Sequence, residues 1–163
     1  MALREILLWP DARLSTACAP VEEITDDIRT LVADMFETMY DAPGRGLAGP
    51  QVGAMLRLFV MDATWKEGEK SPLVAINPEI KALSDETCEM DEGCLSIPEI
   101  TATVTRPVGI TLSWTDLDGQ RHTGEMIGAE ARIAQHEYDH LDGLVHFDRL
   151  DAKTRARLEE IYA

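Results

Sequence analysis

The chain has 163 residues, of which 45% are apolar and 28% are charged, and its formal net charge is −15. This length suits one domain with a hydrophobic core over residues 1–163, and the acidic balance argues against direct nucleic-acid binding. No apolar run approaches the ~20 residues of a membrane span, no basic and apolar signal sequence opens the chain, and three cysteines make no disulfide framework, so we expect a cytoplasmic protein with reduced thiols.

A helix is predicted from Thr25, which can cap its first turn, to about Tyr40. The glycine-rich segment 44–51 follows this helix. It lacks the G-x-x-x-x-G-K-[ST] signature and no strand precedes it, so a phosphate-binding loop does not fit. Small residues here let a backbone edge approach a ligand, and Gln51 at the end offers an amide donor.

Strands are predicted at residues 56–61 and 73–76. Residues 110–115 should pair with residues 120–127, because the Asp-Gly dipeptide at 118–119 is a hairpin signal. With the helices, these strands predict an α+β fold, in which antiparallel or mixed sheets surround a buried helix and a helix closes the C-terminus.

The buried helix carries the most informative motif, His136-Glu137-Tyr138-Asp139-His140. At about 100° per residue, its two imidazoles project from one face and can bind one metal ion. Glu137 lies beside the first ligand, where a carboxylate can take a proton from metal-activated water and return it to a leaving group. Gly128 and Gly143 bound the predicted helix at residues 129–141. The motif is short, so two incidental histidines are the alternative.

A catalytic ion needs a third protein ligand, and the sequence offers two candidates. His146 formally completes the long metzincin protease signature with a third histidine, but that family also needs a methionine turn downstream, and the last methionine here is Met126. We therefore expect His146 to pack in a strand-like segment at 144–147. Cys94 is the second candidate, because a thiolate beside a glycine can approach a metal closely; a buried free cysteine is the alternative.

Three segments together resemble the peptide deformylase family. They match its motifs in order: G-x-G-L-A-x-x-Q at 44–51, E-G-C-L-S at 92–96 and Q-H-E-x-D-H at 135–140. The likeness extends from Trp9-Pro10-Asp11 to Asp148-Arg149-Leu150.

The resemblance implies a hydrolase that removes the N-formyl group from the initiator methionine of nascent chains and releases formate. It implies three ligands for one divalent metal ion: Cys94, His136 and His140. The metal would be ferrous iron by resemblance, with zinc, nickel or cobalt possible. Glu137 would be the acid and base, while the Gln51 amide and the Leu95 backbone N–H would stabilise the oxyanion.

The resemblance also implies that an extended peptide pairs with backbone at Arg45, Gly46 and Gly93. Ala129 and Ile133 would line an apolar pocket for the methionine side chain, with packing into the core as the alternative.

The chain departs from the family pattern at three positions: Arg45, Gly49 and Thr101. These departures concern the loop and the peptide groove and remove no catalytic atom. A charge network would hold the Cys94 segment against the motif helix, as in the family, through three residues: Glu92, Arg106 and Asp139.

Two other classes of function compete with this interpretation. A catalytically altered relative would bind blocked peptides in the same cleft, and a closed structural zinc site would add Cys88 as a fourth ligand. Residues 151–163 should form a solvated amphipathic helix, and the acidic charge gives no support for ribosome contact.

Overall fold

The structure is a computed structural model that describes residues 2–163. Its three α-helices are α1 (Asp26–Asp41), α2 (Gly128–Leu141) and α3 (Ala152–Tyr162). Its seven strands are β1 (Gly46–Ala48), β2 (Leu58–Asp62), β3 (Pro72–Leu83), β4 (Thr87–Cys94), β5 (Ile97–Pro107), β6 (Gly109–Thr115) and β7 (Arg121–Ile127). Four short 3₁₀ helices are η1 (Ala12–Ser15), η2 (Gly49–Val52), η3 (Trp65–Glu67) and η4 (His146–Arg149).

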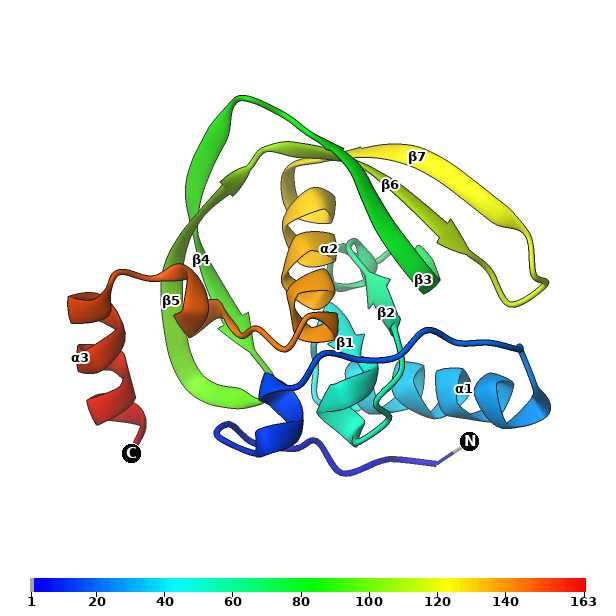
Figure 1. Cartoon of the computed structure of the whole chain (residues 1–163), viewed down its shortest axis with the longest axis horizontal. Coiled ribbons are helices and arrows are strands. Elements are labelled where there is room, and N and C mark those ends of the chain that lie inside the picture. The colour runs from blue at the N-terminus through cyan, green and yellow to red at the C-terminus, as the bar shows by residue number, and fades with distance from the viewer. Residues whose placement is uncertain (1) are drawn as a thin grey trace.

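The strands form two antiparallel sheets around α2, which is the α+β arrangement expected from the sequence. One sheet has the order β1-β2-β3-β6-β7, and the other consists of β4 and β5 alone. Figure 1 shows α2 in the middle of the molecule, with α1 below it and the β4–β5 ribbon to one side. β1 is therefore an edge strand, and β4 also has a free edge.

Helix α1 forms where its apolar periodicity and cap predicted it. The Thr25 hydroxyl accepts a hydrogen bond from the Ile28 N–H at 3.3 Å, which satisfies one of the free donors of the first turn. The buried face of the helix packs on β1 and β2. The glycine-rich segment is thereby delivered directly from the end of α1 to the edge of the larger sheet.

The hairpin of β6 and β7 is confirmed, with Gly109 opposite Ile127 and Thr115 opposite Arg121. β3 is much longer than the predicted strand at 73–76. It continues past Asn77, whose φ of 49° accompanies a shift of register against β6. This irregularity interrupts the alternation of apolar and polar residues along the strand, so the sequence pattern did not predict its second half.

One hairpin was not predicted, and one local prediction was wrong. Residues 87–107, for which no strand was predicted, form the β4–β5 hairpin. The segment at 144–147 is not strand-like, because η4 begins at His146 and the side chain of Asp148 accepts a hydrogen bond from the Val145 N–H.

Helix α2 ends where the sequence indicates, and glycine is required at its exit. Gly143 has φ +79°, and a Cβ atom there would lie 2.9 Å from backbone atoms of Ser15 and Thr16. The close approach brings the N-terminal segment against the end of α2, where the Cys18 N–H donates to the Leu141 carbonyl.

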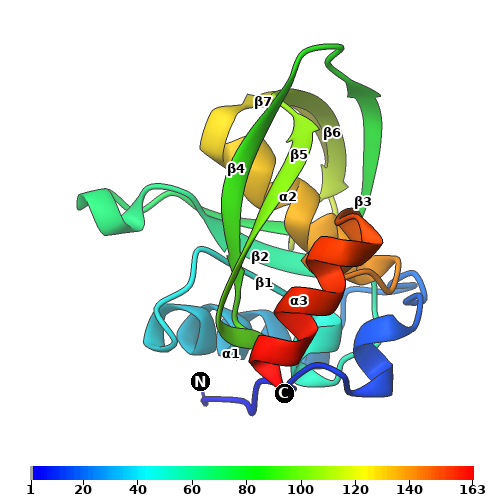
Figure 2. The ribbon, with the colours of Figure 1, turned by 90° about the vertical axis from the view of Figure 1, so that its left-hand side faces the viewer.

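Helix α3 packs outside β5, on the flank away from the larger sheet (Figures 1 and 2). Trp9, Leu158 and Tyr162 pack against a buried cluster that includes Ile97 and Phe147, and the Tyr162 hydroxyl donates a hydrogen bond to the Trp9 carbonyl at 2.8 Å. Within residues 2–163, no helix has the length and apolarity that crossing a membrane requires.

Candidate metal centre

The donor atoms of Cys94, His136 and His140 converge although they come from β4 and α2. All three residues are buried, and their ligand atoms lie within 4.8 Å of one another. The Cys94 Sγ and the His140 Nε2 are 3.5 Å apart. One thiol and two imidazoles of this kind fit a divalent metal ion with a fourth position left for water or substrate.

The ring of His136 is held by a carboxylate on its far side. Its Nδ1 lies 2.8 Å from the Glu92 Oε1, which leaves its Nε2 for the ligand side. Burial lowers the pKa of His136, but the Cys94 thiol and the Glu92 carboxylate raise it more, so the result lies well above the ordinary value. The negative groups that favour a proton on His136 would also attract a metal cation, so this environment fits a cation site.

His140 lies in a different electrostatic environment. Burial lowers its pKa well below the ordinary value, and the neighbouring His136 lowers it further. The imidazole is therefore neutral, which is the form that binds metals. Its Nδ1 is buried without a hydrogen-bond partner among residues 2–163.

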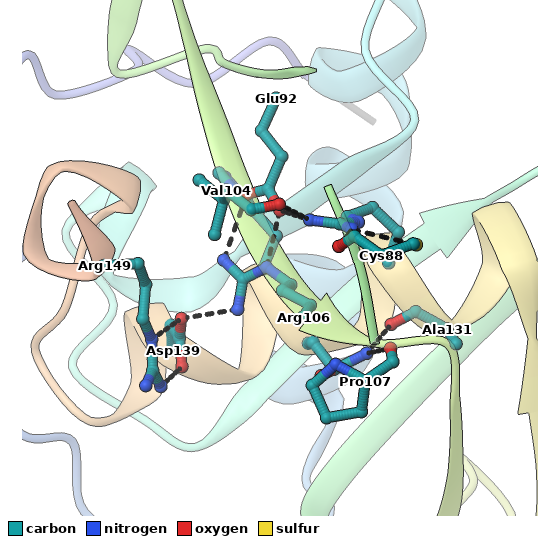
Figure 3. A network of polar contacts seen from close by, with 11 residues as sticks. Cys88, Glu92, Val104, Arg106, Pro107, Ala131, Asp139 and Arg149 are labelled. Atoms are coloured by element: carbon teal, nitrogen blue, oxygen red, sulfur yellow. Dashed lines mark hydrogen bonds and ion pairs between the residues drawn. The ribbon is translucent and has the colours of Figure 1, made fainter. Parts of the chain in front are cut away.

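The predicted charge network is present and is larger than expected. Arg106 donates two hydrogen bonds to Glu92, at 2.5 and 3.0 Å, and one to Asp139 at 2.9 Å. Figure 3 shows Arg106 between these carboxylates, with Arg149 on the other side of Asp139. Arg132 adds bonds of 2.8 Å to Glu92 and to the Val104 carbonyl. The network joins β4, β5, α2 and η4 behind the ligands.

Glu137 is buried beside these donors and forms no ion pair with any of residues 2–163. Burial raises its pKa to about 7, so the carboxyl group exchanges a proton near neutral pH. A Cβ atom at Gly46 would lie 2.5 Å from the Glu137 Oε2, which means that only glycine at this point of β1 leaves room for the carboxylate.

Gln51 is fixed so that its amide nitrogen faces the same centre. Its Oε1 accepts a hydrogen bond from the Ala48 N–H at 2.9 Å, while its Nε2 lies 3.0 Å from the Ser96 Oγ and 3.8 Å from the Cys94 Sγ. Leu95 occupies the turn between β4 and β5, directly after the thiol.

The other ligand candidates lie outside this cluster. Within the described part of the chain, the group of three donors includes neither Cys88 nor His146. The Cys88 Sγ lies 3.5 Å from the Arg132 Nη2 instead. The His146 ring is buried against His136 and Phe147, with centroids 5.9 and 5.0 Å away, so it packs as predicted, although in a 3₁₀ helix.

A cleft of about 660 Å³ opens on the metal centre. Its lining includes every residue assigned to peptide binding: Arg45, Gly46, Gly93, Ala129 and Ile133. Ala129 is exposed, whereas Ile133 is half-buried and both lines the cleft and packs against the hydrophobic core. Thr101 also lines the cleft, opposite Gly93 in the β4–β5 pairing.

Sequence reasoning missed Arg132 and Ser96. Arg132 lies one helical turn before His136 and therefore on the same face, which was an available signal. A charged residue on a helix is usually exposed, and only the fold reveals that this one is buried against Glu92. Ser96 was part of the quoted E-G-C-L-S motif, but nothing local links it to Gln51.

Comparison with known proteins agrees with this geometry. The family model described as polypeptide deformylase matches residues 3–156. The chain belongs to this family. It is 49% identical over 158 residues to a peptide deformylase of Afipia carboxidovorans, covering 97% of this chain and 92% of the relative. A peptide deformylase of Acinetobacter baumannii is 48% identical, with 98% and 90% covered.

Solved structures give the same result for the fold. The crystal structure of a peptide deformylase from Legionella pneumophila matches with a TM-score of 0.92 and 39% identity, covering 99% of this chain and 94% of that one. Peptide deformylases are hydrolases that remove the N-formyl group from formyl-methionyl nascent chains, and they use a metal. The membership gives this chain that activity, whereas the roles of its individual residues are inferred from the geometry.

Proposed function

We propose that this chain deformylates formyl-methionyl peptides with Cys94, His136 and His140 holding one divalent metal ion, which is ferrous iron in the cell. The bound ion would supply Lewis acidity, which activates water and polarises the formyl carbonyl. A thiolate and two imidazoles also suit zinc, nickel or cobalt. Glu92 orients His136, and the arginines around Glu92 keep that carboxylate in place.

Glu137 is the residue that moves protons in this proposal. Its burial and its pKa of about 7 suit a group that takes a proton from water and then donates it to the departing amine. The two transfers leave formate and a free methionyl amine, and Glu137 returns to its starting state.

Gln51 and Leu95 stabilise the negative charge that develops on the formyl oxygen. The Ala48 N–H holds the Gln51 carbonyl oxygen, so the Gln51 amide nitrogen is already directed to the centre before substrate binds. The Leu95 backbone N–H is the second donor. Donors fixed in advance need no reorganisation when charge develops, which is why they lower the barrier.

The peptide binds between two free strand edges. β1 offers backbone at Gly46, the residue before it offers backbone at Arg45, and β4 offers backbone at Gly93 across the cleft. An extended peptide between them pairs through its main chain, so most side chains are tolerated. The methionine side chain enters the apolar end of the cleft at Ala129 and Ile133.

The observation that carries this proposal is the convergence of three buried donors beside Glu137 at the end of an open cleft. Its test is the Glu137→Gln variant, assayed with anaerobic iron loading and formyl-Met-Ala-Ser as substrate. We expect full metal content and a loss of kcat of about 10²–10⁴-fold, the range for general acid and base catalysis. Glu130→Gln, an exposed change on the same helix, is the control. Undiminished formate release by Glu137→Gln would refute the role.

The same assay separates the alternative functions. A relative that only binds blocked peptides would retain formyl-peptide affinity and release no formate in the wild-type chain. Acetyl-Met and unblocked peptides serve as negative substrates. We also infer that residues 1–163 act as one catalytic domain and that the enzyme works in the cytoplasm. We expect no direct contact with nucleic acid or a membrane, and the acidic charge gives no support for a ribosome contact.

A further inference from the structure

One rim of the cleft is basic in a protein whose net charge is −15. Arg45 and Lys66 line the cleft on the β1 side, whereas Asp91 and Glu99 line it on the β4–β5 side. Arg132 also reaches the lining, but Glu92 neutralises it. Arg45 and Lys66 are therefore the cations that a bound peptide would meet on its β1 side.

The η3 turn that carries Lys66 has an ordered backbone, and the Lys66 Nζ lies 5.7 Å from the centre of the Trp65 ring. The Trp65 Nε1 donates to the Gly44 carbonyl at 2.9 Å, which ties the turn to the glycine-rich segment. The Asp62 Oδ1 accepts hydrogen bonds from the backbone N–H groups of Thr64, Trp65 and Ser71. The turn therefore presents Lys66 to the cleft from an ordered base.

Side chains along β1 point alternately to the two faces of the sheet, and this alternation determines which side chain of a bound peptide would face the basic rim. A Cβ atom at Gly46 would meet Glu137, and Ala48 packs in the cluster that contains α2, so these positions face α2. Leu47 packs in the α1 cluster and therefore faces the opposite way. Arg45 lies one residue before β1, where its carbonyl accepts a hydrogen bond from the Asp62 N–H and continues the pairing with β2. It therefore has the same parity as Leu47, and its side chain reaches Glu67 of η3.

An edge-bound peptide follows the same alternation. If the formyl-methionine side chain enters the pocket at α2, the side chain of the second residue points to the other face of the sheet. That face carries Arg45 and Lys66. The second residue is thus the one whose charge these two cations would sense.

Arg45 has capacity for a new partner. Its Nη2 lies 3.2 Å from the Glu67 Oε1, in a pair whose side chains are 41% and 63% exposed. Exposed pairs of this kind exchange easily, because they gain little over hydration. The Arg45 Nε is itself buried without a partner among residues 2–163, so a peptide carboxylate would replace Glu67 at the exposed end of the guanidinium without breaking a buried contact.

We propose that Arg45 and Lys66 give this enzyme a preference for formyl-methionyl peptides with an acidic second residue. The preference rests on the proposed function of the cleft. Glu67 competes with the peptide for Arg45 and so limits the preference.

The test compares three peptides, formyl-Met-Glu-Ser, formyl-Met-Gln-Ser and formyl-Met-Lys-Ser, by formate release at low salt. We expect kcat/KM to be about fivefold higher for the Glu than for the Gln peptide, mostly through KM, and lowest for the Lys peptide. Lys66→Gln should reduce the ratio, the double variant Arg45→Gln with Lys66→Gln should bring it close to one, and Glu67→Gln should raise it. High salt should compress the ratio in the wild type.

Lys81→Gln is the matched control, because it removes an exposed cation from β3, where its partner is Glu79. It should leave the ratio unchanged. Equal kcat/KM for the three peptides, or a ratio that persists in the double variant, would overturn the inference while formate release still supports the proposed function. Titration of the unformylated peptides Met-Glu-Ser and Met-Gln-Ser measures the same preference without turnover, so an inactive protein still decides it.

Discussion

The close fit between Gly46 and Glu137 makes Gly46→Ala the most informative single substitution. The added Cβ atom would lie 2.5 Å from the Glu137 Oε2 and 2.9 Å from its Cδ and Cγ. Carbon and oxygen atoms do not approach so closely without displacement. Since Cγ is also too close, a rotation of the carboxylate alone gives no relief, and Glu137 or β1 has to shift.

We expect this shift to reduce kcat by about 10²-fold, the cost of a misplacement near 1 Å at a reacting group. Overpacking should also lower the free energy of unfolding by about 1–3 kcal/mol. Metal content should be unchanged, because the three atoms nearest to the new methyl group all belong to Glu137 and none to a proposed metal ligand. The assay is formate release with separate determination of kcat and KM, together with metal analysis and urea unfolding.

Gly124→Ala is the matched control, since its Cβ would meet Trp114 at an ordinary 3.6 Å on the far strand β7. It should leave kcat unchanged. A Gly46→Ala enzyme with wild-type kcat would refute the assignment of Glu137 to its observed position.

Three further predictions concern the supporting network and the metal. Arg106→Leu should lower the free energy of unfolding by about 3–5 kcal/mol in urea unfolding, because it leaves the buried carboxylates of Glu92 and Asp139 short of a partner. The control Arg155→Leu, at a half-buried position, should cost about 1 kcal/mol or less. Burial alone would raise the pKa of Glu92, but His136 and Arg106 lower it more and hold it well below its ordinary value of 4.5. Because the pKa of Glu92 is lower in the folded than in the unfolded chain, the ionised carboxylate stabilises the fold at pH values above about 4.5. Unfolding measured at a series of pH values should show this stabilisation lost as the pH falls below about 4.5. The free energy of unfolding should decline less steeply in Glu92→Gln. Chelation should lower the melting temperature, stoichiometric metal should restore it, and the chelated protein should remain folded because its core is extensive.

The sequence predicted those helices whose position depends on residues close together along the chain. The caps and apolar stripe located α1, and the glycines that bound α2 located the motif helix. β5 was missed although buried and exposed residues alternate along it from Ile100 to Arg106. Arginine at a core-facing position disguised that alternation, because its burial depends on Glu92 and Asp139 from other elements.

The candidate site shows the same division. The helical spacing of His136 and His140 follows from α2 alone, so the sequence was sufficient for these two residues. Their meeting with Cys94 depends on how β4 lies against α2, and the resemblance to a family supplied that step. Arg132 and Ser96 enter through contacts made only in the folded chain, which no spacing in the sequence indicates.

X-ray absorption spectroscopy of the metal-loaded protein shows directly which atoms bind the metal. If Cys94, His136 and His140 are the ligands, the zinc form should have one sulfur scatterer at about 2.3 Å and two imidazole nitrogens at about 2.0–2.1 Å, with the sulfur signal lost in Cys94→Ala and retained in Cys88→Ser. A spectrum with two sulfur scatterers, or with three imidazoles and no sulfur, would contradict this ligand set.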